Sequence, residues 1–556
     1  MNLVQDDKPT SRESANADLG TFAGTADSGI ALTDPGQDEP VIHGTTGLSS
    51  GHRPANQRLV KSVGLWLSLF TVSLGLFIVR FLVPTPVGQA DNHDGPRLMC
   101  DQGVWAVTHG APHWFSYAYF EFMRSAGCSH VTRYPSSQLV PLALARILTR
   151  ATGLPGTVNL IALGVLTCVI ASFGIASLAT GLRLRLWAQL AVAAAAWLIV
   201  ADAAFFDVYA SPFTEPAALI GLLLAAAGVV HLGRGRRQTV FGLALAGSGG
   251  FLAMLAKEQY LTLAVPICLT LVLATATGNG GRGLRRFWTR RTGAAAMVVV
   301  LLAILTVGYA LWDRTSKYAT RLHHEQAVDM IFRDIITTGD DHARADLRAL
   351  GLPASWAKYA GTDSFSQISV RYDRLYPRYE AKLSDRTIAH FLLAHPRSII
   401  SVGQQAATYA QQLRVTYLGN YLPNTGHPPG AMESRVVVLT WLMHRLPQHL
   451  GLLWYVPLWT AMAAIAIAAL FVPHGRAWRR DGAVLVLCMT GCAIAAFIPV
   501  AYFAGLSTTR HMVGMNMASA LAFPVSIALA ISMMHQVLTR SRQRSQTFAG
   551  EGVASW

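Results

Sequence analysis

Long apolar segments separated by short basic clusters are the feature that most constrains the fold of this chain. A helix needs about 20 apolar residues to cross the hydrocarbon layer of a bilayer. Segments of that kind begin near residues 62, 157, 186, 215, 239, 261, 294, 450, 482 and 512. The chain is 52% hydrophobic and only 13% charged, whereas soluble domains carry roughly 25% charged residues. This pattern predicts an all-α polytopic membrane protein with about ten transmembrane helices.

The positions of the basic residues predict the orientation of these helices. A formal net charge of +15 could indicate a nucleic-acid-binding protein. The basic residues instead form clusters at alternate ends of the apolar segments, which is typical of cytoplasmic loops in membrane proteins. The clusters lie at 53–61, 183–185, 234–237, 282–291, 476–480 and 540–544. We therefore expect a multi-pass protein of the cytoplasmic (inner) membrane, with both termini in the cytoplasm and no nucleic acid as a partner.

The same pattern divides the chain into five regions. Residues 1–58 are rich in Ser, Thr, Gly, Asp and Pro, which predicts a disordered cytoplasmic tail. We then expect an N-terminal transmembrane catalytic module at 59–312, with a first outer loop at 84–155, and a mostly helical extracytoplasmic insertion at 313–449. C-terminal transmembrane helices are expected at 450–537 and a second cytoplasmic tail at 538–556. The cytoplasmic loops are short and contain no GxxxxGK[ST] motif, so a nucleotide-binding domain is not expected there. Function is expected in the outer loops, because loops held on a rigid scaffold carry most catalytic groups.

The first outer loop contains the stretch Asp91-Asn92-His93-Asp94-Gly95-Pro96-Arg97-Leu98-Met99 directly after the first apolar segment. Two carboxylates, an imidazole and a guanidinium lie within seven residues there, which indicates a candidate active site. The loop also contains Cys100 and Cys128. A disulfide between these two cysteines would be compatible with an extracytoplasmic location, and two unpaired thiols are the alternative.

Further ionisable and polar residues lie at the predicted outer ends of the apolar segments. Charged residues in or beside membrane spans are energetically costly, so each is a candidate functional residue. Any one of them alone is more often an ordinary interfacial residue whose head group reaches water. As a set they could line one cavity with Asp94 and Arg97. The residues are Asp202, Asp207, Tyr209, Ser211, Thr214, Glu215, Lys257, Glu258, Gln259, Arg510 and His511.

Such a cavity suits transfer of a sugar from a polyprenyl phosphate. Asp94 is the candidate base that takes a proton from the acceptor hydroxyl. Positively charged groups would neutralise the departing phosphate; the candidates are Arg97, Lys257 and Arg510. Residues expected to orient the acceptor or shape the site are Asp91, His93, Tyr209, Glu215 and Gln259. A divalent metal held by Asp91 and Asp94 is possible but not favoured, because the loop contains no DxD motif, and no other cofactor is expected.

The Asp94 motif resembles a known family. An unbroken first span followed by an outer-loop carboxylate is similar to the GT-C superfamily of membrane glycosyltransferases. Residues 92–99 resemble the Asn-Gly-Asp-Phe-x-Arg-Val-Met stretch of the glycan-biosynthesis hexose transferases that are called WsfD-like, and 209–216, 256–259 and 329–362 match further motifs in order. This resemblance implies that Asp94 is the base and that Arg97, Glu215, Lys257 and Gln259 occupy polar positions of the site. His93 and Gly95 replace Gly and Phe of the pattern, so the fit of the acceptor near Asp94 is expected to differ.

Together these features predict a GT-C-like bundle with the activity of an inverting hexosyltransferase. Its expected partners are a polyprenyl-phosphate hexose as donor, a cell-surface glycan or lipid-linked precursor as acceptor, and membrane lipid. The alternative is a transporter or flippase for lipid-linked glycans, which predicts inverted repeats and broken helices in matching positions of the two halves; no such symmetry is visible in the sequence. A non-catalytic subunit of a glycan-assembly complex is a further alternative.

Overall fold

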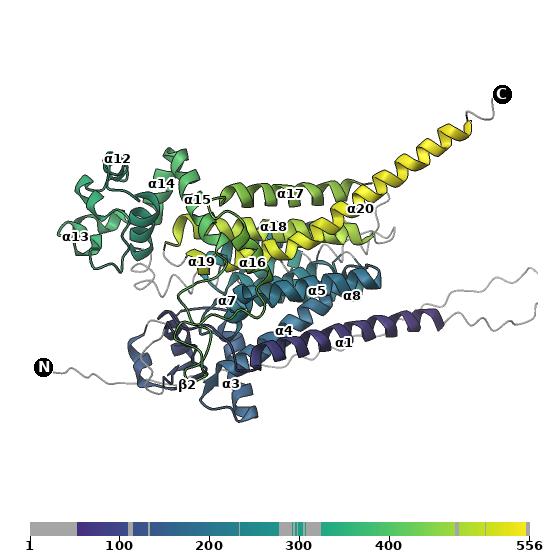
Figure 1. Ribbon diagram of the computed structural model, residues 1–556, viewed down its shortest axis with the longest axis horizontal. Helices are drawn as coiled ribbons and strands as arrows, with labels where there is room; N and C mark the ends of the chain where they lie inside the picture. The colour runs from purple at the N-terminus through teal and green to yellow at the C-terminus, as the bar shows by residue number, and fades with distance from the viewer. Residues whose placement is uncertain are drawn as a thin grey trace, which may run out of the picture. The chain divides into compact units, whose positions relative to one another are not determined.

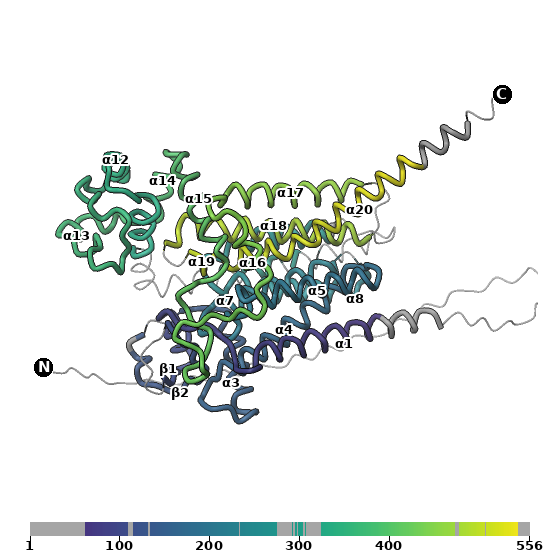
Figure 2. The backbone as a smooth tube through the Cα atoms, viewed as in Figure 1, coloured from purple at the N-terminus to yellow at the C-terminus, as the bar shows by residue number. Residues whose placement is uncertain are grey.

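The structure, a computed structural model, describes most of the chain from Arg53 onward. The described residues are 53–108, 115–131, 134–232, 234–276, 324–472, 477–505 and 508–551, with scattered positions between 292 and 306. Contacts divide the chain into a short unit, Met1–Asn56, and a second unit, Gln57–Trp556. The features below belong to the second unit (Figures 1 and 2). Nearly all of the predicted N-terminal tail, most of the span predicted near residue 294 and the whole basic cluster at 282–291 lie outside the described residues.

Helices occupy the other predicted spans. The long ones are α1 (Arg53–Leu82), α4 (Leu160–Gly181), α17 (Leu452–Phe471), α18 (Ala477–Phe503) and α20 (Val513–Glu551). The shorter ones are α5 (Leu186–Val200), α7 (Glu215–Val229), α8 (Arg236–Met254) and α9 (Ala264–Ala276). Within the described residues, five helices are long and apolar enough to cross a membrane. A sixth span is formed if α5 and the segment Ala203–Ala210, which bends from it by 57°, are counted as one.

The bundle is organised around α7, in which every residue is buried. Helix α7 packs against α8, α4 and α20 (Figure 1). Its contact with α8 depends on glycines, since a Cβ at Gly221 would lie 2.5 Å from the backbone nitrogen of Ala253 and one at Gly249 would lie 2.5 Å from that of Ala225. Small residues at such positions let two membrane helices approach closely. The fold class is therefore the predicted all-α polytopic membrane protein.

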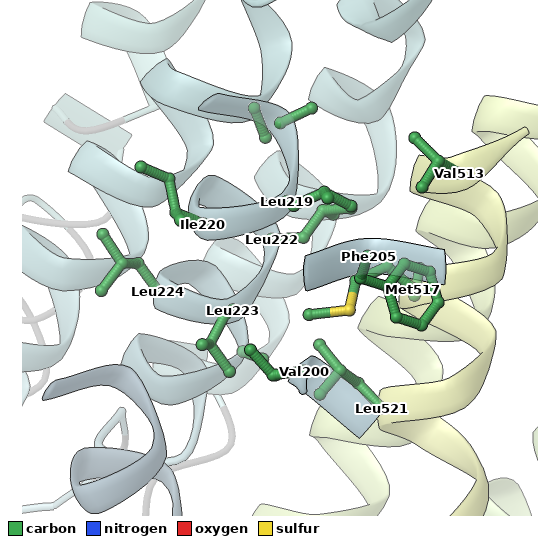
Figure 3. Close-up of a cluster of buried hydrophobic side chains, with 14 of the residues drawn as sticks. Val200, Phe205, Leu219, Ile220, Leu222, Leu223, Leu224, Val513, Met517 and Leu521 are labelled. Carbon is green, nitrogen blue, oxygen red and sulfur yellow. The ribbon is translucent and has the colours of Figure 1, made fainter. Parts of the chain in front are cut away.

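On its other side, α7 contributes to the apolar core shared with α5, α6 (Ala203–Phe206) and α20. Figure 3 shows Leu219, Leu222 and Leu223 of α7 in one cluster with Phe205 of α6 and Met517 of α20. All five side chains are buried. Helix α1 differs, because only 17% of its most apolar window is buried and side chains such as Val72 and Val79 are exposed. Exposed apolar surface of this extent is typical of a membrane-facing helix.

A small antiparallel sheet lies in the loops on either side of α3 (Leu139–Thr152), between α1 and α4. Its strands are β1 (Val104–Ala106), β2 (Glu121–Arg124) and β3 (Val158–Asn159), paired in the order β1-β2-β3. Val104 pairs with Arg124, and Glu121 pairs with Asn159. The short helices of the loop are α2 (Gly95–Met99), η1 (Cys100–Gln102) and η2 (Ala126–His130). Strands of two to four residues are too short to produce the alternating pattern by which a strand is predicted from sequence.

A disulfide joins Cys100, at the end of α2, to Cys128 in η2. The two cysteines are 28 residues apart in sequence. The bond therefore fixes the segment that carries Asp94 to the sheet, since β1 lies between the two cysteines.

Replacing both cysteines with serine is expected to destabilise this loop. Closing a loop of this length is worth about 3–4 kcal/mol in the chain-entropy description of disulfides. We expect a lower thermal midpoint for Cys100→Ser/Cys128→Ser, measured in detergent, and the same decrease when the wild-type protein is reduced. Cys268→Ser is the control, because Cys268 is a free thiol in α9. A non-reducing peptide map without a linked Cys100 and Cys128 pair would contradict the bond itself.

The segment between α9 and α17 contains a second, smaller core. Its buried residues include Phe332, Leu347, Trp356 and Ile388. The elements are η5 (Met330–Ile335, a π-helical turn), α12 (Asp341–Ala349), η6 (Ala354–Tyr359), η7 (Val370–Tyr372), α13 (Tyr376–Tyr379), η8 (Glu380–Lys382), α14 (Asp385–Ala394), α15 (Pro396–Gln411) and α16 (Val438–Arg445). Helix α15 packs against α17, α18 and α19 (Thr508–His511). This contact holds the segment between α9 and α17, called the helical segment below, against the bundle.

Buried ion pairs attach the residues around 414–440 to the membrane helices. Arg414 pairs with Asp207 at 2.7 Å, and Arg80 at the end of α1 pairs with Asp207 at 3.7 Å and with Glu433 at 3.3 Å. Asp202 accepts hydrogen bonds from the backbone of Leu439 and from Thr440. Asp202 and Asp207 therefore connect the residues around 414–440 to the membrane helices. Neither residue lines the cavity that contains Asp94.

Candidate functional site

A cavity of about 450 Å³ lies where several helices end. Its walls come from the loop before α2, the start of α7, the residues after α8, the helical segment and α19. The charged and polar lining residues are Asn92, His93, Asp94, Arg97, Tyr134, Thr214, Glu215, Lys257, Glu258, Glu325, Gln326, Asp329, Tyr417, Arg510 and His511. The apolar ones are Leu98, Phe115, Pro212, Phe213, Phe365 and Ala504. The cavity is thus strongly charged, with both signs represented.

Asp94 is presented to this cavity by the turn that begins α2. His93 has a positive φ of 73°, a left-handed conformation that few residues other than glycine adopt. Pro96 lies in the first turn of α2, where its missing N–H is not needed. A Cβ at Gly95 would lie 2.6 Å from Oδ2 of Asp91 and 2.8 Å from Cβ of Pro212. Gly95 therefore lets the turn pack closely against the start of α7, which a phenylalanine at this position would prevent.

The carboxylate of Asp94 is held between two guanidinium groups. Its Oδ2 accepts a hydrogen bond from Nη2 of Arg510, and its Oδ1 lies 3.3 Å from Nη1 of Arg97. Burial raises the pKa of Asp94, but the positive charges of Arg510, Lys257 and Arg97 outweigh burial and lower the pKa to about 2. Asp94 is consequently ionised at physiological pH, and 36% of its side chain is exposed to the cavity and solvent.

Arg510 is the central cation of the site and is almost completely buried. Besides Asp94, its Nε lies 3.4 Å from Oε1 of Glu215, and its Nη1 donates to Oδ1 of Asn92 at 2.8 Å. Its guanidinium also lies 4.5 Å from the centre of the Phe213 ring, which provides a cation–π contact. Four groups from the loop before α2 and from the start of α7 thus fix one side chain of α19.

Lys257 lies beside Arg510, in the turn between α8 and η4 (Glu258–Leu263). Its Nζ is 3.6 Å from Oε1 of Glu215 and 2.7 Å from Nε2 of His511. Burial lowers the pKa of Lys257, while the nearby carboxylate of Glu215 acts in the opposite direction. Glu215 therefore contacts both cations, Lys257 and Arg510.

Asp91 lies behind the turn, not among the residues that line the cavity. Its Oδ1 accepts the backbone N–H of Gly95 at 2.9 Å, which supports the start of α2. Burial raises the pKa of Asp91 to about 6, because the charged carboxylate is removed from water. In this structure Asp91 contacts the protein backbone, and its role toward the acceptor stays a prediction.

Replacing Asp91 with asparagine is expected to stabilise the protein near neutral pH. The pKa of Asp91 rises from 3.8 to about 6 on folding, so ionising this carboxyl destabilises the folded protein. The destabilisation increases between about pH 4 and pH 6 and reaches about 3 kcal/mol above that range. Asparagine has no charge and can still accept the N–H of Gly95. We expect a higher thermal midpoint for Asp91→Asn at pH 7.5 but not at pH 4, measured in detergent. A variant less stable than wild type at pH 7.5 would contradict this reasoning.

Of the other predicted site residues, one lines the cavity and two are buried away from its lining. His93 lines the cavity, and its ring contacts that of Phe115 edge to face at 5.0 Å. Gln259 is buried behind His511, with its amide nitrogen 3.4 Å from Nδ1 of that histidine. Tyr209 is buried in η3 (Asp207–Ala210) against Phe206, at a ring separation of 5.5 Å, and is not a lining residue.

Several lining residues were not among the predicted ones. Glu325 and Asp329 come from the start of the helical segment, Phe365 from the loop after η6, and Tyr417 from the loop after α15. Asp329 begins one of the stretches that carry the family resemblance, and this signal could have identified it. For Tyr417 no sequence signal exists, because its position depends on how the segment folds back onto the bundle.

The fold and the site define a class, namely a polytopic helical membrane protein with a charged cavity at the ends of its helices. The chain belongs to the family described as the YfdI N-terminal transmembrane domain, whose model matches residues 55–540. Among solved structures, the chain is similar to the archaeal oligosaccharyltransferase AglB from Archaeoglobus fulgidus in complex with an inhibitory peptide and a dolichol-phosphate, with 14% identity and a TM-score of 0.35. That match covers 86% of this chain and 52% of AglB, so the chain spans about half of the AglB chain. No curated protein matches.

Proposed function

We propose that this protein is an inverting GT-C-type glycosyltransferase that moves a hexose from a polyprenyl-phosphate donor to a surface glycan or its lipid-linked precursor. The observation that carries this proposal is the ionised carboxylate of Asp94, placed in a cavity beside the buried cations Arg510 and Lys257. A transferase of this kind needs one base for the acceptor hydroxyl and positive charge for the leaving phosphate. Both parts lie within one cavity here.

The reaction follows from this arrangement. The acceptor oxygen forms a bond to the anomeric carbon as the bond from that carbon to the phosphate oxygen breaks, and the hydroxyl proton moves to Asp94. The polyprenyl phosphate leaves with the electron pair and is stabilised by Arg510, Arg97 and Lys257. Because these residues supply positive charge, a divalent metal is not favoured.

The pairing of Asp94 with Arg510 suggests how the donor prepares the base. A carboxylate with a pKa of about 2 is a weak base. When a donor phosphate binds Arg510, its oxygens compete with Asp94 for the same N–H groups, and a nearby negative charge raises the pKa of a carboxylate. Donor binding is thus expected to strengthen the base just before the acceptor reacts.

We further propose that the cavity opens on the extracytoplasmic side of the cytoplasmic membrane. The cavity is lined by the loop that follows α1, by the start of α7 and by residues just before α20. Basic residues lie at the other end of the bundle. Arg183, after α4, is 3.7 Å from Asp481 of α18, and Arg234, after α7, is 3.2 Å from the same carboxylate. Basic residues gathered at that end support its assignment to the cytoplasm.

The proposal is tested with purified protein in detergent, a polyprenyl-phosphate hexose and glycan extracted from a deletion strain. We expect release of polyprenyl phosphate and a glycan heavier by one hexose. Detergent removes the two compartments that a flippase requires, so transfer under these conditions supports an enzyme. Identical envelope glycans, by mass, in the deletion strain and its complemented counterpart would contradict the proposal.

A further inference from the structure

His511 lines the cavity beside its two buried cations, Lys257 and Arg510. Its Nε2 is 2.7 Å from Nζ of Lys257 and 3.3 Å from Nη2 of Arg510. The residue is only 6% exposed. One imidazole nitrogen therefore faces two groups that donate hydrogen bonds.

These contacts determine where the imidazole carries its proton. The guanidinium of Arg510 is always protonated and can only donate. Nε2 must consequently offer its lone pair, and the proton belongs on Nδ1. The amide nitrogen of Gln259 lies 3.4 Å from Nδ1, so this amide must be turned over before it can accept the Nδ1 proton.

The amide of Gln259 provides the acceptor that the Nδ1 proton needs. Oε1 of Gln259 is buried and has no hydrogen-bond partner within the part of the chain that the structure describes. The two ends of a glutamine amide have the same shape, so the group can be turned over without other changes. Oε1 then accepts from Nδ1–H of His511.

The charges around His511 keep it neutral. Burial lowers its pKa well below the usual value, and the positive charges of Lys257 and Arg510 act in the same direction. The carboxylates of Glu215, Asp94 and Glu258 and the phenols of Tyr134 and Tyr260 also belong to this region. Glu215 contacts the two cations, and no ion pair of its own is recorded for His511 among the described side chains.

We propose that His511 is a positioning residue, a neutral imidazole that is oriented by Gln259 and whose Nε2 holds Lys257 and Arg510 in place for the donor phosphate. The inference rests on the proposed function, because it assigns these two cations to the phosphate of the donor. Without the Nε2 acceptor, the ammonium of Lys257 would turn toward Glu215, and less positive charge would face the cavity.

Two polar substitutions of His511 test whether its Nε2 acceptor positions the cations or whether the side chain only fills space. In His511→Gln, the side-chain carbonyl reaches the place of Nε2 and restores a neutral acceptor. In His511→Asn, the amide is one methylene shorter and reaches only the place of Nδ1. Hydrogen bonds to charged groups are worth enough that losing one weakens binding about 10- to 100-fold. We expect that loss for His511→Asn, and binding within about threefold of wild type for His511→Gln.

The experiment measures binding of farnesyl phosphate to the purified full-length protein in detergent, with farnesol as the uncharged control. In transfer assays, His511→Asn should raise the KM for the donor more than it lowers kcat, and His511→Gln should reverse this change. Thermal midpoints of both variants show whether they are folded. Gln259→Leu, which removes the partner of Nδ1, should also weaken binding of farnesyl phosphate.

The outcomes distinguish this inference from the proposed function. Wild-type binding of farnesyl phosphate together with equal binding by His511→Asn would overturn the inference alone. Equal losses in His511→Gln and His511→Asn would also overturn it, because the acceptor would then be irrelevant. If the wild-type protein prefers farnesyl phosphate no more than farnesol, the donor site itself is wrong, and the proposed function fails together with this inference.

Discussion

Asp94→Asn is expected to reduce hexose transfer by about 10²- to 10⁴-fold, which is the usual contribution of a positioned acid or base. Asparagine has nearly the shape of aspartate, and its carbonyl oxygen can still accept a hydrogen bond from Arg510 or Arg97. It cannot take the proton of the acceptor hydroxyl. The loss should therefore appear in kcat, with the donor KM changed much less, in transfer assays on the purified protein.

The control for this substitution is Asp341→Asn. Asp341 begins α12 in the helical segment, and its side chain is 90% exposed, so its removal should leave transfer unchanged. The same variants can be compared in the deletion strain by the mass of its envelope glycans. A strain whose only copy is Asp94→Asn and which makes the wild-type glycan at the wild-type rate would rule out Asp94 as the base.

Much of the fold follows from local sequence properties. Apolar length predicts where the helices lie, because a membrane segment must satisfy its own backbone hydrogen bonds. The break between α5 and α6 is less predictable. Apolar residues lie on both sides of Asp202. Asp202 caps α6 through the backbone N–H of Ala204 and also binds the distant Thr440. The bend between the two helices therefore involves a tertiary contact that the apolar pattern does not contain.

Part of the candidate site was predictable because its residues lie next to the ends of apolar segments, which places them at a similar depth in the membrane. Lys257, Glu215 and Arg510 each lie next to the end of an apolar segment, and the structure places them around one another as expected from that depth. Depth does not determine the direction of a side chain. Tyr209 lies at the same level but faces Phe206, while Asp91, three residues before Asp94, supports the backbone of Gly95.

Residues from the helical segment could not be assigned to the site in the same way. Glu325 and Tyr417 are more than 200 residues from Asp94 in sequence, and they lie at the cavity in a segment that is attached by packing of α15 and by the buried ion pair of Arg414 with Asp207. Such contacts depend on the assembled fold and leave no periodic signal in the sequence. The resemblance to a family therefore indicated Asp329 within a motif but no role for Tyr417.

Arg510→Met should have the largest effect on the stability of the folded protein. Arg510 is 4% exposed and neutralises the carboxylates of Asp94 and Glu215. Removing one member of a buried ion pair leaves the other charge uncompensated and costs about 3–5 kcal/mol. We expect a large decrease in the thermal midpoint together with loss of farnesyl phosphate binding.

Arg97→Met is the matched control for this prediction. Arg97 also pairs with Asp94, but its side chain is 29% exposed and Asp94 itself is 36% exposed, so the pair is partly solvated and worth no more than about 1 kcal/mol. A second comparison adds Glu215→Gln to Arg510→Met. Because this change removes a carboxylate that Arg510 no longer neutralises, the double variant should be less destabilised than the sum of the two single variants. Arg510→Met and Arg97→Met with equal thermal midpoints would show that the charge of Arg510 is not buried in the way that the cavity requires.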